Sequence, residues 1–193
     1  MPFAHFTLTF SQPSNAPTAI YSMLLALFNI VTNTAFPFIP IQITLIDLAI
    51  EGYTSFFLSF LENSKPLKGT FLRTVIRNAL PYALTIIISI ILITFTRSGM
   101  GLNIEESHTL MYLIIGGVSI FAVIEACRPF NRISTFLCTT TAVGFFFAAI
   151  LFKKLLHLTA INEQVILILG ASLILAYIVA VSYTHLRAHE TPE

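Results

Sequence analysis

The 193-residue sequence is poor in charge: charged residues make up 10% of it, whereas soluble domains carry about 25%. It has no Trp, and its two cysteines, Cys127 and Cys138, are too few for a disulfide framework and lack metal-binding spacing. Ten Lys and Arg against nine Asp and Glu give a net charge of +1, so no basic surface for nucleic acid is present. Because 56% of the residues are hydrophobic, a water-soluble globule is excluded and a membrane protein with several spans is indicated.

Six stretches are long and apolar enough to cross the hydrocarbon core, which takes about 20 residues in a helix. Their length and the absence of a period-2 alternation indicate helices, so the predicted fold is an all-α, six-helix transmembrane bundle. We expect the fourth and fifth spans to extend into their flanks, and Pro37 and Pro40 to leave a tight hairpin between the first two. The spans are Thr18–Phe36, Ile39–Phe60, Asn78–Phe95, Leu110–Ala126, Thr135–Phe152 and Gln164–Tyr183.

Both ends of the chain look foreign to this bundle, which we assign to residues 18–183. Residues 1–17 are too polar for a span and lack the basic region of a signal peptide. Residues 184–193 (THLRAHETPE) resemble adapter-derived read-through at the end of a gene fragment, so we interpret them as an artefactual tail. His185 and His189 have the spacing of half a zinc site, but no third ligand accompanies them, and a disordered end is the preferred interpretation.

The distribution of positive charge predicts that both termini are cytoplasmic. In that orientation six Lys and Arg residues lie in inner loops and three in outer loops, as the positive-inside rule requires. The Lys153–Lys154 pair on the outer side opposes the rule. The inner residues are Lys65, Lys68, Arg73, Arg77, Arg128 and Arg132, and the outer ones are Arg97, Lys153 and Lys154.

Three carboxylates lie within the predicted spans: Asp47 and Glu51 in the second, and Glu125 near the inner end of the fourth. A charged carboxylate at the bilayer centre costs about 2.5–3.5 kcal/mol. Asp47 and Glu51 are four residues apart, which places them on one face of an α-helix, where like charges repel unless a cation or a shared proton intervenes. No Lys or Arg lies at mid-depth to neutralise them. For Glu125 the alternative is that its side chain reaches the inner headgroups beside Arg128.

Gly52 directly follows Glu51, and a glycine at this point would let the second helix unwind and expose carbonyl oxygens. Broken membrane helices are tolerated where they line a cavity and coordinate ions. We therefore expect a broken second helix beside the two carboxylates.

The residues around these carboxylates resemble two motifs of one family, the calcium-pump type of cation-transporting P-type ATPases. The stretch IPIQITLIDLAIEG at residues 39–52 resembles the family's sixth helix, I-P-x-Q-L-x-x-x-N-L-x-T-D-G. The stretch IEACRPFNRIS at 124–134 is similar to the inner end of its eighth helix, I-E-x-C-x-x-x-N-x-x-S. The segments SFFLSFLEN and KGTFLRTVIRNALP resemble the loop and seventh helix of a bacterial branch of these pumps.

This resemblance implies that the six spans are helices five to ten of a pump in the bacterial plasma membrane. Its missing partners would be the N-terminal and cytoplasmic domains of the same protein. Asp47, Glu51 and Glu125 fall on the family's cation-ligand positions, so the resemblance implies a metal site for Ca²⁺ or for Mg²⁺ or Mn²⁺. Ile50 stands where the calcium pumps have Thr, and the first span has no acid, which favours one site for a hard cation over two.

The sequence contains none of the family's ATP-handling motifs: no D-K-T-G-T, no T-G-E, no T-G-D-G-x-N-D and no Gly-rich phosphate loop. As given, the chain is therefore not expected to hydrolyse ATP, and ATP and Mg²⁺ would act only in the missing part. Two alternatives of other classes remain open at this point. One is an ion-coupled secondary transporter or channel, whose carboxylates would carry protons or sodium. The other is a membrane scaffold that does not transport.

Overall fold

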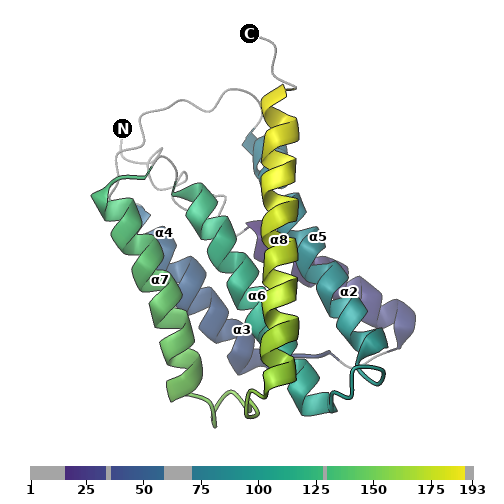
Figure 1. Ribbon diagram of the computed structural model, residues 1–193. Coiled ribbons are helices and arrows are strands. Elements are labelled where there is room, and N and C mark those ends of the chain that lie inside the picture. Colours follow the sequence, from purple (N-terminus) through teal and green to yellow (C-terminus); the bar gives the residue numbers. More distant parts are fainter. Residues whose placement is uncertain (1–15, 34–35, 59–70, 128–129, 190–193) are drawn as a thin grey trace.

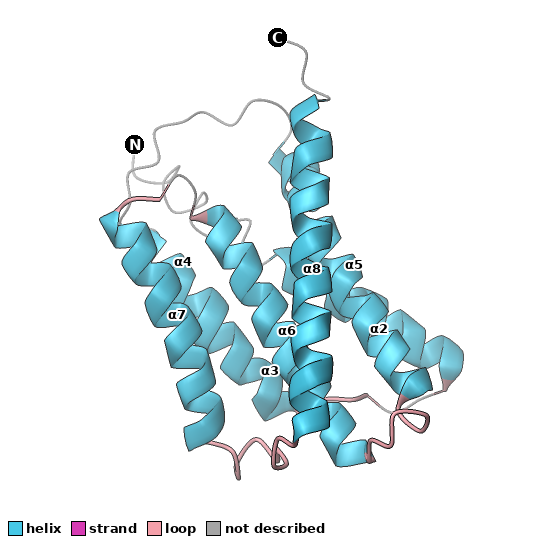
Figure 2. Ribbon diagram, viewed as in Figure 1, coloured by secondary structure: helices cyan, strands magenta, loops and turns pink. Residues whose placement is uncertain are grey.

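The computed structural model describes residues 16–33, 36–58, 71–127 and 130–189, and these residues contain helices and loops but no strand (Figures 1 and 2). α3, η1 and α4 follow one another without interruption and form one column, so the described chain has six helical columns. The all-α prediction is confirmed. The elements are α2 (Ala16–Thr32), α3 (Pro40–Ile46), η1 (Asp47–Gly52), α4 (Tyr53–Leu58), α5 (Phe71–Thr96), α6 (Ile104–Ala126), α7 (Arg132–Leu151) and α8 (Glu163–His189).

The helix boundaries differ from the predicted spans mainly by extension. α6 and α7 begin before Leu110 and Thr135, as we expected for the fourth and fifth spans. α5 begins at Phe71, so Arg73 and Arg77 lie in its first turns and not in a loop. α8 continues beyond Tyr183 to His189, so the interpretation of this stretch as a disordered end was wrong for its backbone. Residues 1–15 and 190–193 lie outside the described residues.

Among the described residues, three helices are long and apolar enough to cross a membrane by length and composition, which supports an integral membrane protein. They are Ala79–Thr96, Ile104–Ala126 and Arg132–Leu151. Ala19–Thr32 and Glu163–Val179 form shorter apolar helices. The crossing of the membrane by α2, α8 and the α3–η1–α4 column stays a prediction.

α6 is the central helix of the bundle. Its side chains from Leu110 to Ile120 are buried without exception, and it packs against α2, α5, α7, α8 and η1. A helix that is apolar on every side is expected where neighbours surround it. α2 packs mainly against α5 and also touches α6. The first two spans are joined by a short connection, as expected for a hairpin. The helix that α2 mainly packs against, however, is α5.

Two adjacent glycines let neighbouring helices approach α6 closely. A Cβ atom added at Gly116 would lie 2.0 Å from Cζ of Phe145 in α7, and one added at Gly117 would lie 2.5 Å from Cδ2 of Leu173 in α8. Small residues at such positions are the usual means of close helix packing in membranes, where apolar lipid gives no hydrophobic driving force. Phe145 is fully buried and stacks at a tilt on Tyr112, with 5.6 Å between the ring centroids.

The helix ends at one side of the bundle are fixed by polar side chains. The connections α2–α3, α5–α6 and α7–α8 all lie at this end (Figure 2). Asn103 Oδ1 accepts from the Glu106 N–H at 2.8 Å, and the Asn103 N–H donates to Glu106 Oε2 at 2.9 Å, which forms a capping box. Asn162 Nδ2 donates to Glu106 Oε1 at 2.8 Å, so the same carboxylate ties the start of α6 to the start of α8. At the opposite end, Asn131 Oδ1 accepts from the Ser134 N–H at 2.7 Å and caps α7.

Gly116→Ala should destabilise the bundle by about 1–3 kcal/mol, because the new methyl group would overlap a ring that has no room to move. Gly170→Ala in α8 is the matched control, since a Cβ atom there meets nothing within 4 Å. Thermal unfolding of the full chain in detergent measures both variants. Equal stability of the Gly116→Ala variant and the unchanged chain would contradict the close α6–α7 contact.

Candidate functional site

The second helical column changes its geometry at the residues that carry the acids. η1 is a π-helical segment, and its wider hydrogen bonding is seen where the Tyr53 N–H donates to the Leu48 carbonyl five residues earlier. A Cβ atom on Gly52 would lie 3.2 Å from the Asp47 carbonyl oxygen, so glycine suits the end of this segment. The expected broken helix is thus realised as a wide turn within a continuous helix and not as an unwound stretch. Single π-turns inside α-helices are frequently found at functional sites.

The two carboxylates of η1 have different environments. Glu51 is 7% exposed, and its Oε1 atom is buried without a hydrogen-bond partner in the described part of the chain. Asp47 lies at the start of η1 and is exposed on the surface of the bundle. An α-helix would place Asp47 and Glu51 on one face. In the π-helical segment one of them is exposed and the other is buried.

The column that carries η1 is anchored on both sides of it. Toward its start, Gln42 is buried and its Nε2 donates to the Leu156 carbonyl in the α7–α8 connection at 2.8 Å. Just after η1, the hydroxyl oxygens of Thr54 and Thr141 lie 3.3 Å apart, and those of Tyr53 and Thr140 lie 3.0 Å apart. These contacts fix the depth and rotation of Glu51 relative to α7. A neighbouring pocket of about 520 Å³ between this column and α7 is lined by Leu48, Ala49, Gly52, Tyr53, Phe56, Thr140 and Gly144.

Glu125 comes from another helix. It lies in the last turn of α6, next to the helix end at Ala126, and it is half-buried. α6 packs against η1, so the third carboxylate belongs to a helix that touches the other two. Among the described residues no three His, Cys, Asp or Glu side chains are close enough together to hold a metal ion. The three acids are therefore placed on contacting helices but are not gathered into one site in this structure. Arg128, the alternative neighbour of Glu125, lies outside the described residues.

Two further buried oxygens lie on α6. The hydroxyl groups of Tyr112 and Ser119 are buried and have no hydrogen-bond partner within the described ranges. Hydroxyl side chains in apolar helices commonly donate to a carbonyl of the preceding turn. The sequence does not show which hydroxyls lack such a bond, so sequence reasoning missed these two. Three polar residues in or just after α2 are less enclosed: Ser22 and Asn29 are half-buried, and Asn33 is exposed with a left-handed φ of 52° after the end of α2.

Comparisons with known proteins support the family resemblance. The chain is 33% identical over 180 residues to the "Probable cation-transporting ATPase exp7" of Streptococcus pneumoniae serotype 4. The match covers 88% of this chain and 23% of that protein, so the chain spans less than a quarter of the length of the curated relative. No family model matches the chain, and no solved structure matches it.

Sequence identity at this level over most of the chain agrees with the helical bundle and with the two motifs. The prediction that the chain resembles a cation-transporting ATPase is confirmed, while the calcium-pump type stays a prediction. The similarity over most of this chain to one portion of a much longer protein is consistent with a C-terminal transmembrane part of a P-type pump.

Proposed function

We propose that this chain is the membrane transport part of an ATP-driven cation pump, in which Asp47, Glu51 and Glu125 bind a hard cation. The observation that carries the proposal is the buried Glu51 oxygen without a partner, inside a π-helical segment of a membrane column. The relative's description as a cation-transporting ATPase supports the same activity for the protein that contains this chain.

Glu51 lies where an unsatisfied carboxylate is costly. A polar group buried without a hydrogen bond loses its hydration and gains nothing in return, and ionisable groups inside membranes mark ion or proton paths by default. No basic side chain pairs with Glu51 in the described part of the chain. A bound cation would remove the deficit, and the wide turn at Gly52 would aim the carboxylate toward it.

Asp47 indicates where the rest of the protein lies. Its carboxylate is exposed on the bundle surface, in the middle of a column whose ends are anchored at Gln42 and Thr54. Facing lipid at that depth would cost several kcal/mol. The relative is more than four times as long as the matched segment, so we infer that another part of the same pump covers this face. That covering part would also supply further oxygen ligands.

Glu125 would complete the site from α6. A pump must release its ion as well as bind it, so a site whose ligands come together only in one state is what transport requires. In our proposal the cation draws Glu125 and the η1 carboxylates together, and the arrangement seen here corresponds to the separated state.

Calcium is our first choice of cation. Carboxylate, carbonyl and hydroxyl oxygens suit Ca²⁺, which takes 6–8 of them, and also Mg²⁺ or Mn²⁺. Thiols and imidazoles, which select copper and zinc, are absent from the three proposed positions. ATP and Mg²⁺ would act on the part of the pump that lies outside this chain. We place the pump in the bacterial plasma membrane, in agreement with the bacterial source of the relative, with both ends of the bundle's chain in the cytoplasm.

Glu51→Gln in the full-length pump should weaken the cation dependence of phosphorylation by ATP at least about tenfold, because the amide cannot compensate the charge of the ion. Asp47→Asn and Glu125→Gln should act in the same direction. The measurement is phosphoenzyme formation from labelled ATP over a calcium titration, repeated with Mg²⁺ and Mn²⁺.

The matched control is Glu163→Gln, because Glu163 is an exposed carboxylate in the first turn of α8. This variant should keep the calcium dependence of the unchanged pump. If Glu51→Gln keeps it as well, the site assignment is wrong even though the family is right.

The chain alone should insert into membranes but release no phosphate from ATP, since no phosphate-handling motif is present in it. Phosphate release by the purified chain in liposomes, with and without calcium, is the measurement. Turnover that follows the amount of chain, above protein-free liposomes, would contradict this expectation.

A further inference from the structure

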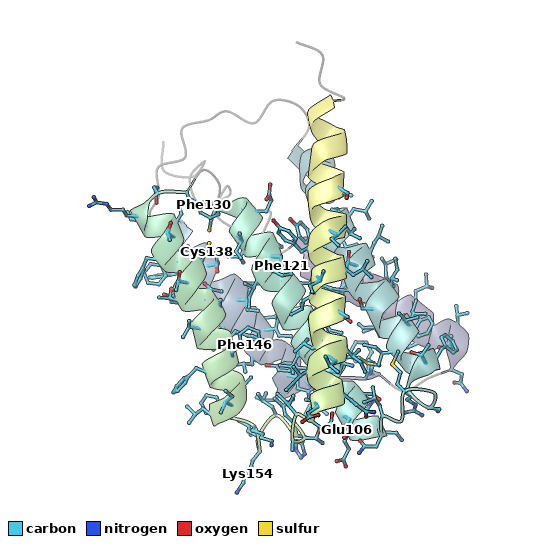
Figure 3. All side chains as sticks on the ribbon, viewed as in Figure 1. Glu106, Phe121, Phe130, Cys138, Phe146 and Lys154 are labelled. Atoms are coloured by element: carbon cyan, nitrogen blue, oxygen red, sulfur yellow. The ribbon has the colours of Figure 1, made fainter. Side chains whose placement is uncertain are left out.

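A second pocket, which is not lined by Asp47, Glu51 or Glu125, opens at the end of the bundle where α6 and α8 begin. Its volume is about 440 Å³, within the usual range for small-ligand sites. Figure 3 places Glu106 and Lys154 at this end of the molecule. The pocket is lined by Phe36, Pro37, Phe38, Ile39, Gln42, Glu105, His108, Lys153, Lys154, His157, Leu158 and Thr159.

The charged wall of the pocket is predominantly basic. Lys153 and Lys154 follow the end of α7, both are exposed, and neither forms an ion pair within the described residues. His108 and His157 add two imidazoles. Glu105 is the acidic residue among the lining residues, while its neighbour Glu106 is already engaged by Asn103 and Asn162. With neutral histidines the lining carries a net positive charge, and no group in it compensates both lysines.

The opposite wall is apolar and aromatic. Phe36 and Phe38 pack edge to face with ring centroids 6.0 Å apart, and Phe38 is buried. Phe36 is 48% exposed and Leu158 is half-buried, so hydrocarbon surface is accessible beside the lysines. The pocket therefore has both a basic and an apolar surface. A free inorganic ion would not need the apolar surface.

The apolar spans of α6 and α7, assigned by length and composition, end on this side at Ile104 and Leu151, and the pocket lies at the connections immediately beyond them. We therefore expect the pocket at the boundary between hydrocarbon and headgroups. In the predicted orientation this is the outer side of the membrane. The positive-inside rule enriches lysine on the inner side, so it does not explain two adjacent lysines here. Basic pockets between membrane helices bind anionic lipid headgroups on the cytoplasmic side of membranes, and a pair of lysines can bind a phosphate in the same way on the outer side.

We propose that this pocket binds the phosphate of an anionic phospholipid headgroup. Lys153 and Lys154 pair with the phosphate, and the Phe36–Phe38 wall packs against the glycerol and the first methylene groups. The proposal is independent of cation transport, because none of the three membrane carboxylates lines the pocket.

Native mass spectrometry of the full chain in detergent tests this, with phosphatidylglycerol and phosphatidylcholine of the same acyl chains offered together. We expect a phosphatidylglycerol adduct in clear preference to phosphatidylcholine. Lys153→Gln with Lys154→Gln should weaken that adduct about tenfold or more, given the usual contribution of a basic residue near anionic lipid. Unchanged phosphatidylglycerol binding by the double variant would overturn the proposal.

Two matched variants separate the pocket from general effects. Arg97→Gln removes a positive charge on the same side, outside the pocket lining, and should leave the preference intact. Glu105→Gln removes the carboxylate of the pocket and should strengthen the adduct, which a misfolded variant would not do. Equal losses in the Arg97 and lysine variants would mean a net-charge effect and would reject the site. Complete displacement of the lipid by excess inorganic phosphate would identify a soluble-anion site and reject the lipid.

Discussion

The close packing around α6 is the constraint on which the rest of the bundle depends. In a membrane, lipid tails are as apolar as leucine, so helices associate through fitted surfaces and interhelical hydrogen bonds. Gly116 and Gly117 allow Phe145 of α7 and Leu173 of α8 to reach the backbone of α6. The same helix also packs against α5 and η1, so it links the other columns, and its last turn carries Glu125. A methyl group in this region would therefore disturb helices far from the substitution.

Hydrogen bonds on both sides of η1 hold its departure from α-helical geometry in place. Gln42 fixes one side through the Leu156 carbonyl, and Thr54 fixes the other through Thr141. Between these anchors the backbone adopts wider turns, Glu51 is buried, and Asp47 stays at the surface. The polar residues of the family motifs therefore have two kinds of role. Gln42 and Asn131 cap helices and link segments, whereas Glu51 Oε1 has no hydrogen-bond partner among the described residues and is the oxygen that we propose binds a cation.

Two adjacent carboxylates in the first turn of α6 have different surroundings. The Glu106 carboxylate accepts hydrogen bonds from the Asn103 N–H and from Asn162 Nδ2, so it stabilises the fold. Glu105, one residue earlier, forms part of a pocket with two lysines and an aromatic wall. Counting charges in sequence treats these neighbours alike, and only their contacts separate the carboxylate that caps a helix from the one that lines a pocket.

By itself the sequence indicated the fold class, the family resemblance and the three carboxylates of the predicted spans. Composition and the length of apolar runs are local properties, and the cost of an acid in hydrocarbon is visible without coordinates. The tertiary structure decided what depends on distant contacts. It made α5 the main partner of α2, turned the expected break at Gly52 into a π-helical segment, and left Asp47 and Glu51 with different exposure. It also brought Phe38, His108 and Lys153 to one pocket, because residues far apart in a chain become neighbours only through helix packing.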